Sequence, residues 1–254
     1  MSFEVSRDAY GRFMGRFSEP LAIQFTDWVA PQPGQRALDV GCGPGALTAV
    51  LADRLGSDAV VAVDPSETFV RAVRGRLPGV DARVTTADRL PFDEDTFDLA
   101  LAQLVVHFMP DPVAGLREMA RVTRAGGIVA ANVWDLATGR APISLFWRAV
   151  RELDPTHPGE SGLPGVGAGS LTELFEQAGL DDVAAIEQTV QSEFGSFDEW
   201  WESYTLGIGP PGVFLASLDQ AHRDAVRDRC RAILPPAPFT VPGTAWSVRG
   251  RVRP

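Results

Sequence analysis

The chain contains no lysine: all 23 of its basic residues are arginine, against 33 acidic residues and a formal net charge of −10. This absence excludes enzymes that form a Schiff base with a lysine of their own, including the pyridoxal-phosphate class. It also excludes the Gly-Lys-Ser/Thr phosphate loop and the lysine-dependent kinase site. The acidic charge balance indicates a protein that does not bind nucleic acid.

Cysteine and histidine are scarce as well, with two and three residues in the whole sequence. Two cysteines, Cys42 and Cys230, are not enough for a disulfide framework or a zinc cluster. No His-Glu-x-x-His spacing occurs either, so we expect no metal site. No apolar run approaches the roughly 20 residues that span a bilayer, and the first residues lack the pattern of a secretory signal. We therefore expect a cytoplasmic protein that does not insert into membranes.

Short apolar runs alternate with helical stretches between residues 35 and 135. The apolar runs are nearly continuous, as is typical of parallel strands that are buried on both faces of a sheet. Repeated strand–helix–strand units of this length predict an α/β fold with a doubly wound sheet and helices on both faces. The predicted strands are 36–40, 59–63, 82–85, 97–102 and 127–133, and the predicted helices are 45–55, 67–76 and 112–123.

Two further segments flank this core. Residues 1–34 contain a predicted helix at 19–29, and residues 136–254 contain a loop at 154–169 that is dense in proline and glycine. The remainder reads as helices at 170–178, 197–206 and 215–233 and strands at 183–190 and 244–252. With 254 residues, of which 45% are hydrophobic, we expect one domain, 1–254, with an insertion in its C-terminal half.

A glycine-rich turn closes the first predicted strand and opens a helix. Gly41 and Gly43 lie in the segment LDVGCGPGA, where a ligand can approach backbone N–H groups. As a bare pattern, Gly-x-Gly-x-x-Ala also fits a dinucleotide fingerprint or a turn without any ligand. Asp39, however, puts a carboxylate beside the turn, which repels a pyrophosphate and favours an ammonium or sulfonium group.

Acidic residues also stand at the ends of the next two predicted strands. Asp64 ends the second strand, and Asp88 follows the third. Because the carboxyl ends of parallel strands meet in the crevice where open α/β sheets bind ligands, we expect these side chains to face one site. Asp64 is placed to accept ribose hydroxyls, and the alternative is that it caps the helix that follows.

Five motifs in order, LDVGCGPG, VAVDPS, ADRLPF, FDLALAQLVVHF and AGGIVAANVW, resemble those of class I S-adenosylmethionine-dependent methyltransferases. The similarity covers roughly residues 8 to 135 and is greatest to the type 11, ubiquinone/menaquinone-biosynthesis-like group that acts on small molecules. It implies a Rossmann-like, seven-stranded, mostly parallel sheet that ends in an antiparallel hairpin. It also implies S-adenosyl-L-methionine as methyl donor, with S-adenosyl-L-homocysteine as product, bound in a core at residues 35–135.

The same resemblance implies roles for individual residues. Asp64 would bind the ribose diol, Asp88 the adenine amino group, and Phe69 the adenine face. The glycine turn and the backbone near Gln103 would hold the methionine moiety. The cofactor-binding residues predicted from the residues and the resemblance together are Tyr10, Arg16, Asp39, Gly41, Gly43, Asp64, Pro65, Phe69, Ala87, Asp88 and Gln103.

The aromatic segment near the N-terminus corresponds to a helix that closes over the cofactor in the resembling family. Tyr10, Phe13 and Arg16 would then form a lid. Arg16 is the candidate partner for the methionine carboxylate, since a guanidinium matches carboxylate geometry. The alternative is an amphipathic helix that packs its aromatic side chains on the sheet.

The acceptor side is specified less closely. Methyl transfer is an in-line displacement on an activated donor, so alignment and desolvation can supply the catalysis, and a base is needed only for a protonated acceptor. His107 is the candidate base, with a structural role as the alternative. Aromatic residues of the C-terminal half are expected to wall an apolar pocket for a small-molecule acceptor, namely a subset of Trp134, Phe146, Trp147, Phe194, Trp200, Trp201 and Phe214.

Two other functions stay open at this point. One is a non-catalytic protein that binds S-adenosylmethionine, and the other is a nicotinamide-dependent oxidoreductase. Asp39 and the later motifs speak against the oxidoreductase, whereas turnover of an acceptor separates the non-catalytic binder from an enzyme. The sequence leaves open the oligomeric state and whether oxygen, nitrogen, carbon or sulfur accepts the methyl group.

Overall fold

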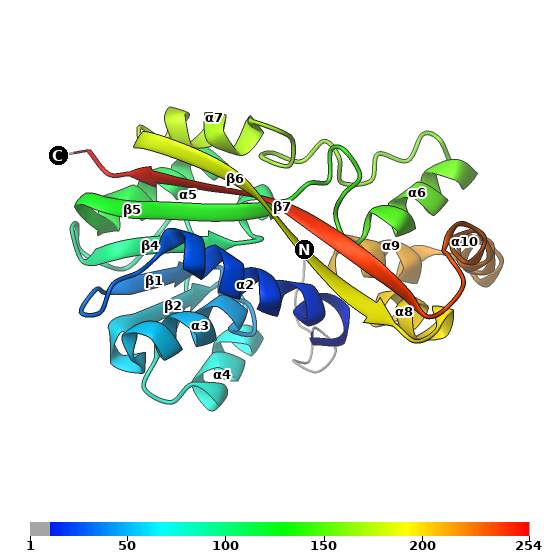
Figure 1. Cartoon of the computed structure of the whole chain (residues 1–254), viewed down its shortest axis with the longest axis horizontal. Helices are drawn as coiled ribbons and strands as arrows, with labels where there is room; N and C mark the ends of the chain where they lie inside the picture. Colours follow the sequence, from blue (N-terminus) through cyan, green and yellow to red (C-terminus); the bar gives the residue numbers. More distant parts are fainter. Residues whose placement is uncertain (1–10, 254) are drawn as a thin grey trace.

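The structure, a computed structural model, describes residues 11–253 and is built on one seven-stranded sheet with the strand order β3-β2-β1-β4-β5-β7-β6 (Figure 1). Strands β1 to β5 are parallel, and β7 runs antiparallel between β5 and β6. This confirms the predicted Rossmann-like sheet with its terminal hairpin. The strands are β1 Ala37–Val40, β2 Val60–Asp64, β3 Asp81–Val84, β4 Phe97–Gln103, β5 Thr123–Trp134, β6 Asp181–Phe194 and β7 Phe239–Arg251.

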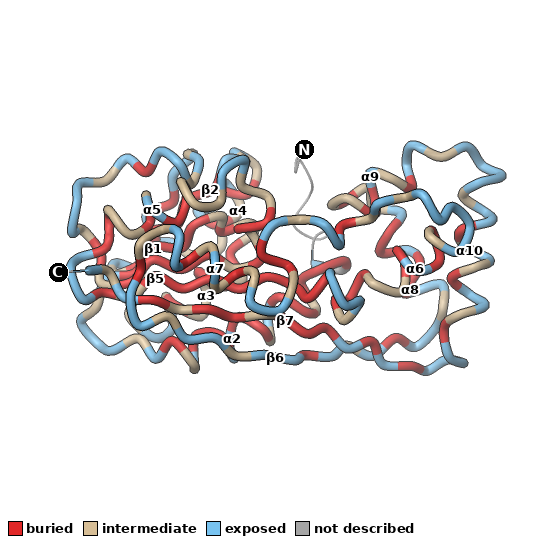
Figure 2. Tube along the Cα trace, turned by 90° about the horizontal axis from the view of Figure 1, so that it is seen from above, coloured by how far each residue is buried: buried red, intermediate tan, exposed pale blue. Residues whose placement is uncertain are grey.

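Helices cover both faces of the sheet because alternate strand residues point to opposite sides. In β4, Leu99 and Leu101 pack into a core with α2, α3 and α4, whereas Ala100 and Ala102 pack into another with α5 and α7. Burial in Figure 2 is concentrated in the strands between these two layers. The bounds of these helices are α2 Arg16–Val29, α3 Ala46–Leu55, α4 Glu67–Arg76, α5 Pro112–Val122 and α7 Ser170–Gln177, with short 3₁₀ turns η2 at Ser57–Ala59 and η3 at Val106–Phe108.

Four helices gather around the far half of the β6–β7 hairpin and form what we call the helical cap (Figure 1). They are α6 Ser144–Leu153, α8 Phe197–Thr205, α9 Gly209–Ser217 and α10 Gln220–Ile233. The cap has a third, aromatic core, in which the rings of Phe146 and Tyr204 stack with centroids 4.8 Å apart. The π-helical turn η1, Gly11–Gly15, packs against this core through Phe13.

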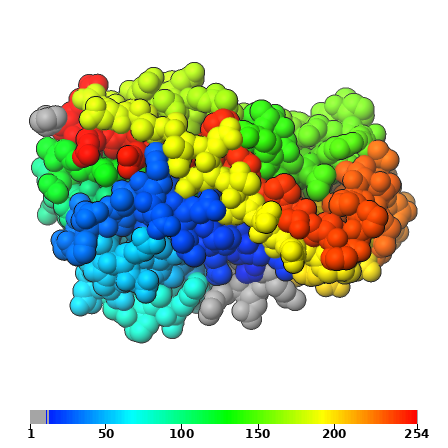
Figure 3. Space-filling view, viewed as in Figure 1, coloured from blue at the N-terminus to red at the C-terminus, as the bar shows by residue number. Residues whose placement is uncertain are grey.

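Helix α2 runs alongside the edge strand β6, as Figure 3 shows for the blue and yellow segments. The Gln24 side chain donates a hydrogen bond to the carbonyl of Thr189 at 3.2 Å, so the helix also satisfies part of the sheet edge. The N-terminal helix therefore packs on the sheet along its length. Across the part of the chain that the structure describes, no helix combines the length and apolarity that crossing a membrane requires.

The C-terminal half departs from the sequence prediction in three places. The prediction of one helix over 215–233 is wrong, because Asp219 ends one segment and caps the next by accepting the N–H of His222 at 2.8 Å. Helix α6 was not predicted. Strand β6 extends to Phe194, and β7 begins at Phe239, so both are longer than the predicted strands 183–190 and 244–252.

Candidate functional site

The carboxyl ends of β1, β2 and β4 open onto a cavity of about 480 Å³, which we call the main pocket. It lies where the strand order reverses between β1 and β4, the position at which open α/β sheets bind ligands. Its size is ordinary for a small-molecule site. The predicted residues that line it are Gly41, Gly43, Asp64, Pro65, Phe69, Ala87, Asp88 and Gln103.

The glycine turn forms the floor of this pocket and requires glycine. Gly41 has φ +73°, and a Cβ there would lie 2.3 Å from Cγ2 of Val105. The N–H groups of Gly41 and Cys42 donate to the carbonyl of Val63 at 2.8 and 3.0 Å, which ties the turn to β2. The backbone at the end of β1 is thus held open to a ligand without any side chain of its own in the way.

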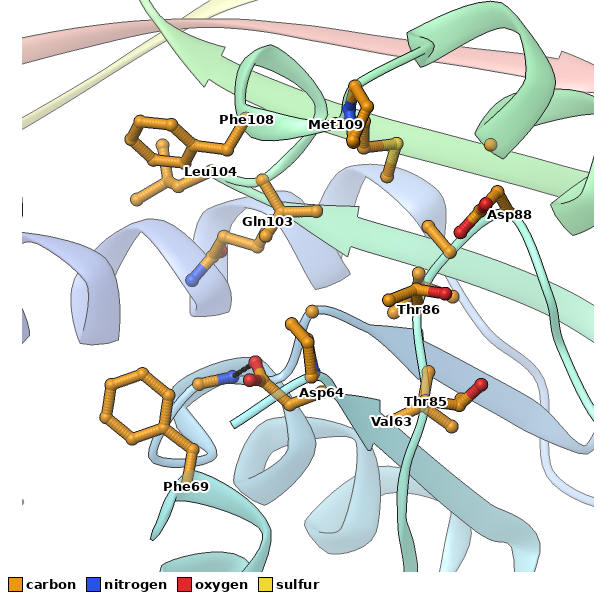
Figure 4. A pocket seen from close by; sticks show the side chains of 18 of the residues that line it. Val63, Asp64, Phe69, Thr85, Thr86, Asp88, Gln103, Leu104, Phe108 and Met109 are labelled. Atoms are coloured by element: carbon orange, nitrogen blue, oxygen red, sulfur yellow. Dashed lines mark hydrogen bonds between the residues drawn. The ribbon is translucent and has the colours of Figure 1, made fainter. Parts of the chain in front are cut away.

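Asp64 ends β2 and directs its carboxylate into the main pocket (Figure 4). Its Oδ2 accepts the N–H of Gly43 at 2.9 Å, and its Oδ1 accepts the N–H of Ser66 at 2.8 Å. Burial raises the pKa of Asp64, and these two hydrogen bonds oppose the rise. Since a carboxylate offers about four acceptor sites, two stay available for the hydroxyls of a ligand.

A residue other than Asp64 caps the N-terminus of α4. Ser66 is the N-cap, and its Oγ accepts the N–H of Phe69 at 3.4 Å. Asp64 therefore supports the turn before the helix and still faces the pocket, so the alternative of a pure helix cap does not account for its position.

The other two predicted adenosine contacts lie at different sides of the main pocket. Figure 4 places Phe69, on α4, beside Asp64, and Asp88 across the pocket near Thr86. The Thr86 side chain donates a hydrogen bond that lowers the pKa of the exposed Asp88 carboxyl, which is therefore charged at neutral pH. The pocket thus presents one buried carboxylate, Asp64, and one exposed carboxylate, Asp88.

A smaller recess of about 30 Å³ adjoins the main pocket beneath the glycine turn. Asp39 lines this recess and not the main pocket, and its Oδ2 accepts the hydroxyl of Thr48 at 2.6 Å. Desolvation raises the pKa of Asp39 to about 7, and the bond from Thr48 opposes the rise. A buried carboxyl of this kind is suited to a cationic group placed close to it.

Gln103 stands between the recess and the main pocket and lines both. Its Nε2 donates to the carbonyl of Ser18 at 3.0 Å, so α2 is joined to the end of β4. Its Oε1 is buried and has no hydrogen-bond partner among residues 11–253. Because buried polar atoms are nearly always satisfied, this oxygen is available to an N–H or O–H donor that enters the recess or the main pocket.

Arg16 lines neither the main pocket nor the recess, so the described structure does not bring it to the predicted donor site. Its Nη2 forms an ion pair with Oε1 of Glu199 at 2.9 Å, and its guanidinium lies 4.3 Å from the ring centre of Phe194. The side chain therefore fastens α2 to the hairpin and α8. Tyr10, the other predicted lid residue, lies outside the described residues.

His107 sits in η3, directly after β4, and does not line the main pocket. Burial lowers its pKa to about 3, so the imidazole is neutral, and its Nδ1 has no partner in the described part of the chain. It faces an inner chamber of about 60 Å³ instead. His107 was expected in a loop that faces the methyl group. It lies instead on the inner chamber, which is separated from the main pocket by Leu104 and Phe108, and these two residues line both hollows.

The aromatic residues that were predicted to wall an acceptor pocket occupy different places in the structure. Of the seven aromatic residues proposed for an acceptor pocket, Trp134 lines the inner chamber, while Phe146, Trp147, Phe194, Trp200 and Trp201 are buried in the core of the cap and Phe214 packs against it. The described structure therefore assigns most of this group to packing, and only Trp134 of the seven lines the inner chamber.

Sequence reasoning missed two residues of the site. Leu104 adopts a left-handed conformation with φ +60°, and its N–H donates to both the carbonyl and the Oδ1 of Asn132 at 2.9 and 3.1 Å. Glu160, in the proline- and glycine-rich loop, is buried and lines the inner chamber. No spacing signals Leu104, and a single acid in a polar loop gives no hint of burial.

Comparison with known proteins shows what the chain is similar to. A model described as "Methyltransferase domain" matches residues 38–131, which hold all the lining strands of the main pocket. An uncharacterized methyltransferase of Mycobacterium tuberculosis is 39% identical over 153 residues, which are 60% of this chain and 57% of that protein. The alignment therefore spans little more than half the length of this relative.

Two further proteins extend the likeness over more of the chain. The trans-aconitate 2-methyltransferase of Methylobacterium radiotolerans is 29% identical over 235 residues, 86% of this chain and 84% of that one. The phosphoethanolamine N-methyltransferase 2 of Haemonchus contortus, solved with S-adenosylhomocysteine, shares the fold with a TM-score of 0.55 at 17% identity, covering 100% of this chain and 60% of that one. Over the segment that holds the main pocket, the chain is therefore similar to methyltransferases, and over its whole length it shares their fold.

Proposed function

We propose that this chain transfers a methyl group from S-adenosylmethionine to a small organic acceptor. The observation that carries the proposal is the convergence of Asp64, the glycine turn and Gln103 on one pocket at the sheet's switch point. The similarity of residues 38–131 to a methyltransferase domain supports the choice of donor. The apolar chamber next to the main pocket supports a small acceptor over a macromolecule, as does the net charge of −10.

The residues present fit the donor. Asp64 keeps acceptor sites for two ribose hydroxyls, and Asp88 faces the pocket from its other side. The unpartnered Oε1 of Gln103 and the buried carboxyl of Asp39 border the recess, where an ammonium group would donate to the first and be attracted by the second. We therefore assign the adenosine to the main pocket and the amino-acid end of the donor to the recess.

Bound S-adenosylmethionine supplies a methyl group that its sulfonium already activates. The chain then needs to hold donor and acceptor in line and to exclude water, which can contribute roughly 7–11 kcal/mol to the barrier reduction. Leu104 and Phe108 are placed for this, since they line both the main pocket and the chamber. The proposed catalysis is thus mainly alignment and desolvation.

Binding and turnover test the proposal separately. S-adenosylhomocysteine at 100 times its Kd should stabilise the protein by about 2.7 kcal/mol, a melting shift of roughly 5–10 °C for a chain of this size. NAD and NADP serve as controls and should give no comparable shift. A shift with NAD alone would favour the oxidoreductase alternative and contradict the proposal.

The non-catalytic alternative calls for a second measurement. Protein incubated with S-adenosylmethionine labelled in its methyl group and with small acceptors should produce S-adenosylhomocysteine and a labelled product, detected by mass spectrometry. A protein that binds the donor and produces neither compound with any acceptor tested would be a binding protein.

A further inference from the structure

We propose that the inner chamber is the acceptor-recognition subsite, where Glu160 and His107 hold an N–H or O–H group carried on an apolar body. This inference rests on the proposed methyl transfer and names the class of acceptor. The chamber is separate from the donor residues, yet it shares Leu104 and Phe108 with the main pocket. His107 lies in the fourth motif but lines neither the main pocket nor the recess, and Glu160 lies outside all five motifs.

Three side chains of the chamber carry polar atoms: Glu160, His107 and Trp134, whose indole Nε1 is buried and has no hydrogen-bond partner within residues 11–253. The other lining side chains are apolar and come from η1, the segment from the end of β4 through η3, the segment after β5 and the start of α9: Phe13, Met14, Leu104, Phe108, Leu136, Ile143, Pro210 and Pro211. Hydrogen bonds formed inside such walls are strong, and unpaired polar groups there are costly. These polar groups, and the charge of Glu160 above all, therefore decide which ligands are accepted.

Glu160 is buried without a cationic partner. It is 6% exposed, and its Oε2 accepts the indole N–H of Trp147 at 2.7 Å. Desolvation raises the pKa of this carboxyl to about 7, the Trp147 bond opposes the rise, and no positive charge in the described structure compensates it. A buried carboxyl that is not neutralised costs stability, and such groups gather at functional sites.

His107 supplies the second polar group. It is 5% exposed, and its Nδ1 has no hydrogen-bond partner within residues 11–253. Since burial keeps the imidazole neutral at physiological pH, its ring offers one donor and one acceptor. A protic group in the chamber can thus donate to Glu160 and exchange a second hydrogen bond with His107.

This chemistry separates acceptors by charge. A phenol or an aryl amine brings a donor for the carboxylate and an apolar ring for the walls. A carboxylate ligand would place a second negative charge beside Glu160 in a poorly solvated site, where like charges repel strongly. The chamber therefore favours neutral or cationic protic heads and rejects carboxylates.

The free volume limits how the ligand enters. About 60 Å³ is well below the roughly 150 Å³ of a cavity that holds benzene, so a ring must displace a neighbouring side chain. Met14 is the side chain best able to yield, because methionine has three rotatable bonds and adapts to irregular gaps. The head group then lies at Glu160 while the ring takes the space next to η1.

Matched probes test the subsite directly. Phenol, aniline and benzoate are titrated at pH 8 into protein saturated with S-adenosylhomocysteine, and binding is followed by calorimetry and by the indole N–H signals of the six tryptophans. The Trp147→Phe variant assigns the signal of Trp147. We expect phenol or aniline to shift that signal and to bind at least tenfold more tightly than benzoate, and the two arms distinguish O–H from N–H recognition.

The variant Glu160→Gln tests whether Glu160 causes the preference for phenol over benzoate, and Glu176→Gln is its matched control. Glu160→Gln preserves shape and removes the charge, so the preference for phenol over benzoate should fall at least tenfold, whereas Glu176, an exposed acid on α7, should leave it unchanged. Unchanged discrimination in a folded Glu160→Gln protein would overturn the inference. So would equal binding of benzoate, or no binding of phenol and aniline, in a protein that binds S-adenosylhomocysteine. Failure to bind S-adenosylhomocysteine would instead overturn the proposed function itself.

Discussion

The carboxylate of Asp64 accepts the N–H of Gly43 across the switch point of the sheet, with 2.9 Å between Oδ2 and the nitrogen. One hydrogen bond thereby joins the second acidic motif to the glycine turn. The two halves of the predicted donor site therefore depend on each other, and a change at Asp64 affects both the ligand contact and the turn.

Asp64→Ala should weaken the binding of S-adenosylhomocysteine by roughly tenfold to several hundredfold, because hydrogen bonds to a charged group contribute about 1.5–3 kcal/mol each. Calorimetry on the folded variant measures this. Asp53→Ala, which removes an exposed acid from α3, is the control and should bind as the unaltered protein does. Near-native affinity in Asp64→Ala would reduce Asp64 to a support of the turn.

Arg16→Gln should leave the affinity for S-adenosylhomocysteine within about threefold, because the guanidinium pairs with Glu199 and not with the donor site. The pair is partly exposed, so its loss should also cost less than about 1 kcal/mol of folding stability. Titration of the donor and urea unfolding check the two statements. A loss of affinity as large as that of Asp64→Ala would restore Arg16 as a partner of the methionine carboxylate.

His107 should make the folded protein sensitive to acid. Its pKa lies at about 3 in the folded state, below the usual 6.5, so between these values the unfolded chain takes up a proton that the folded one does not. Stability is then full above pH 6.5 and is lost as the pH falls, by about 2 kcal/mol at pH 5.

The His107→Gln variant should lack this loss, so the difference in unfolding free energy between it and the unaltered protein should change with pH by that amount. His222→Gln, at an exposed histidine of α10, serves as the control. Parallel curves for the unaltered protein and His107→Gln would show that His107 titrates normally and is accessible to solvent.

Glu160 should lower the stability of the folded protein as the pH rises, which is opposite to the effect of His107. Its pKa is raised from 4.5 to about 7, so the folded state holds a proton that the unfolded chain releases. The stability it contributes is present below pH 4.5 and is lost as the pH rises through 7, up to about 3 kcal/mol at pH 8. Glu160→Gln should therefore raise the melting temperature at pH 8 more than at pH 5, as calorimetry can show. An equal effect at both values would mean that the carboxyl is solvated.

The donor half could be predicted closely from the sequence because its signals are local. The buried parallel strands read as continuous apolar runs, and the acidic residues follow from strand ends that meet in one crevice. Asp64 and Gln103 thus appear in the main pocket where the motifs predicted. Asp39 was expected there too, but its side chain points under the turn to Thr48, because strand residues alternate between faces.

The half of the chain proposed for the acceptor was harder to predict, because its features depend on contacts between residues that are distant in the sequence. Strand β6 lies at the sheet edge and exposes most of its residues, so little hydrophobic alternation marks its full length. The pairing of Arg16 with Glu199 joins residues far apart in the sequence, and the burial of Glu160 depends on the indole of Trp147. None of these contacts follows from spacing along the chain.

The chain leaves the sheet for the acceptor side in two excursions, one between β5 and β6 and one between β6 and β7 (Figure 1). Both begin after the last residue of the main pocket, Gly115, and outside the matched family segment 38–131. A strand of the sheet borders each excursion at both ends, so each excursion is an insertion between two strands whose positions the sheet fixes. If these two segments are exchanged between relatives, we expect chimeras that keep donor binding and change the choice of acceptor.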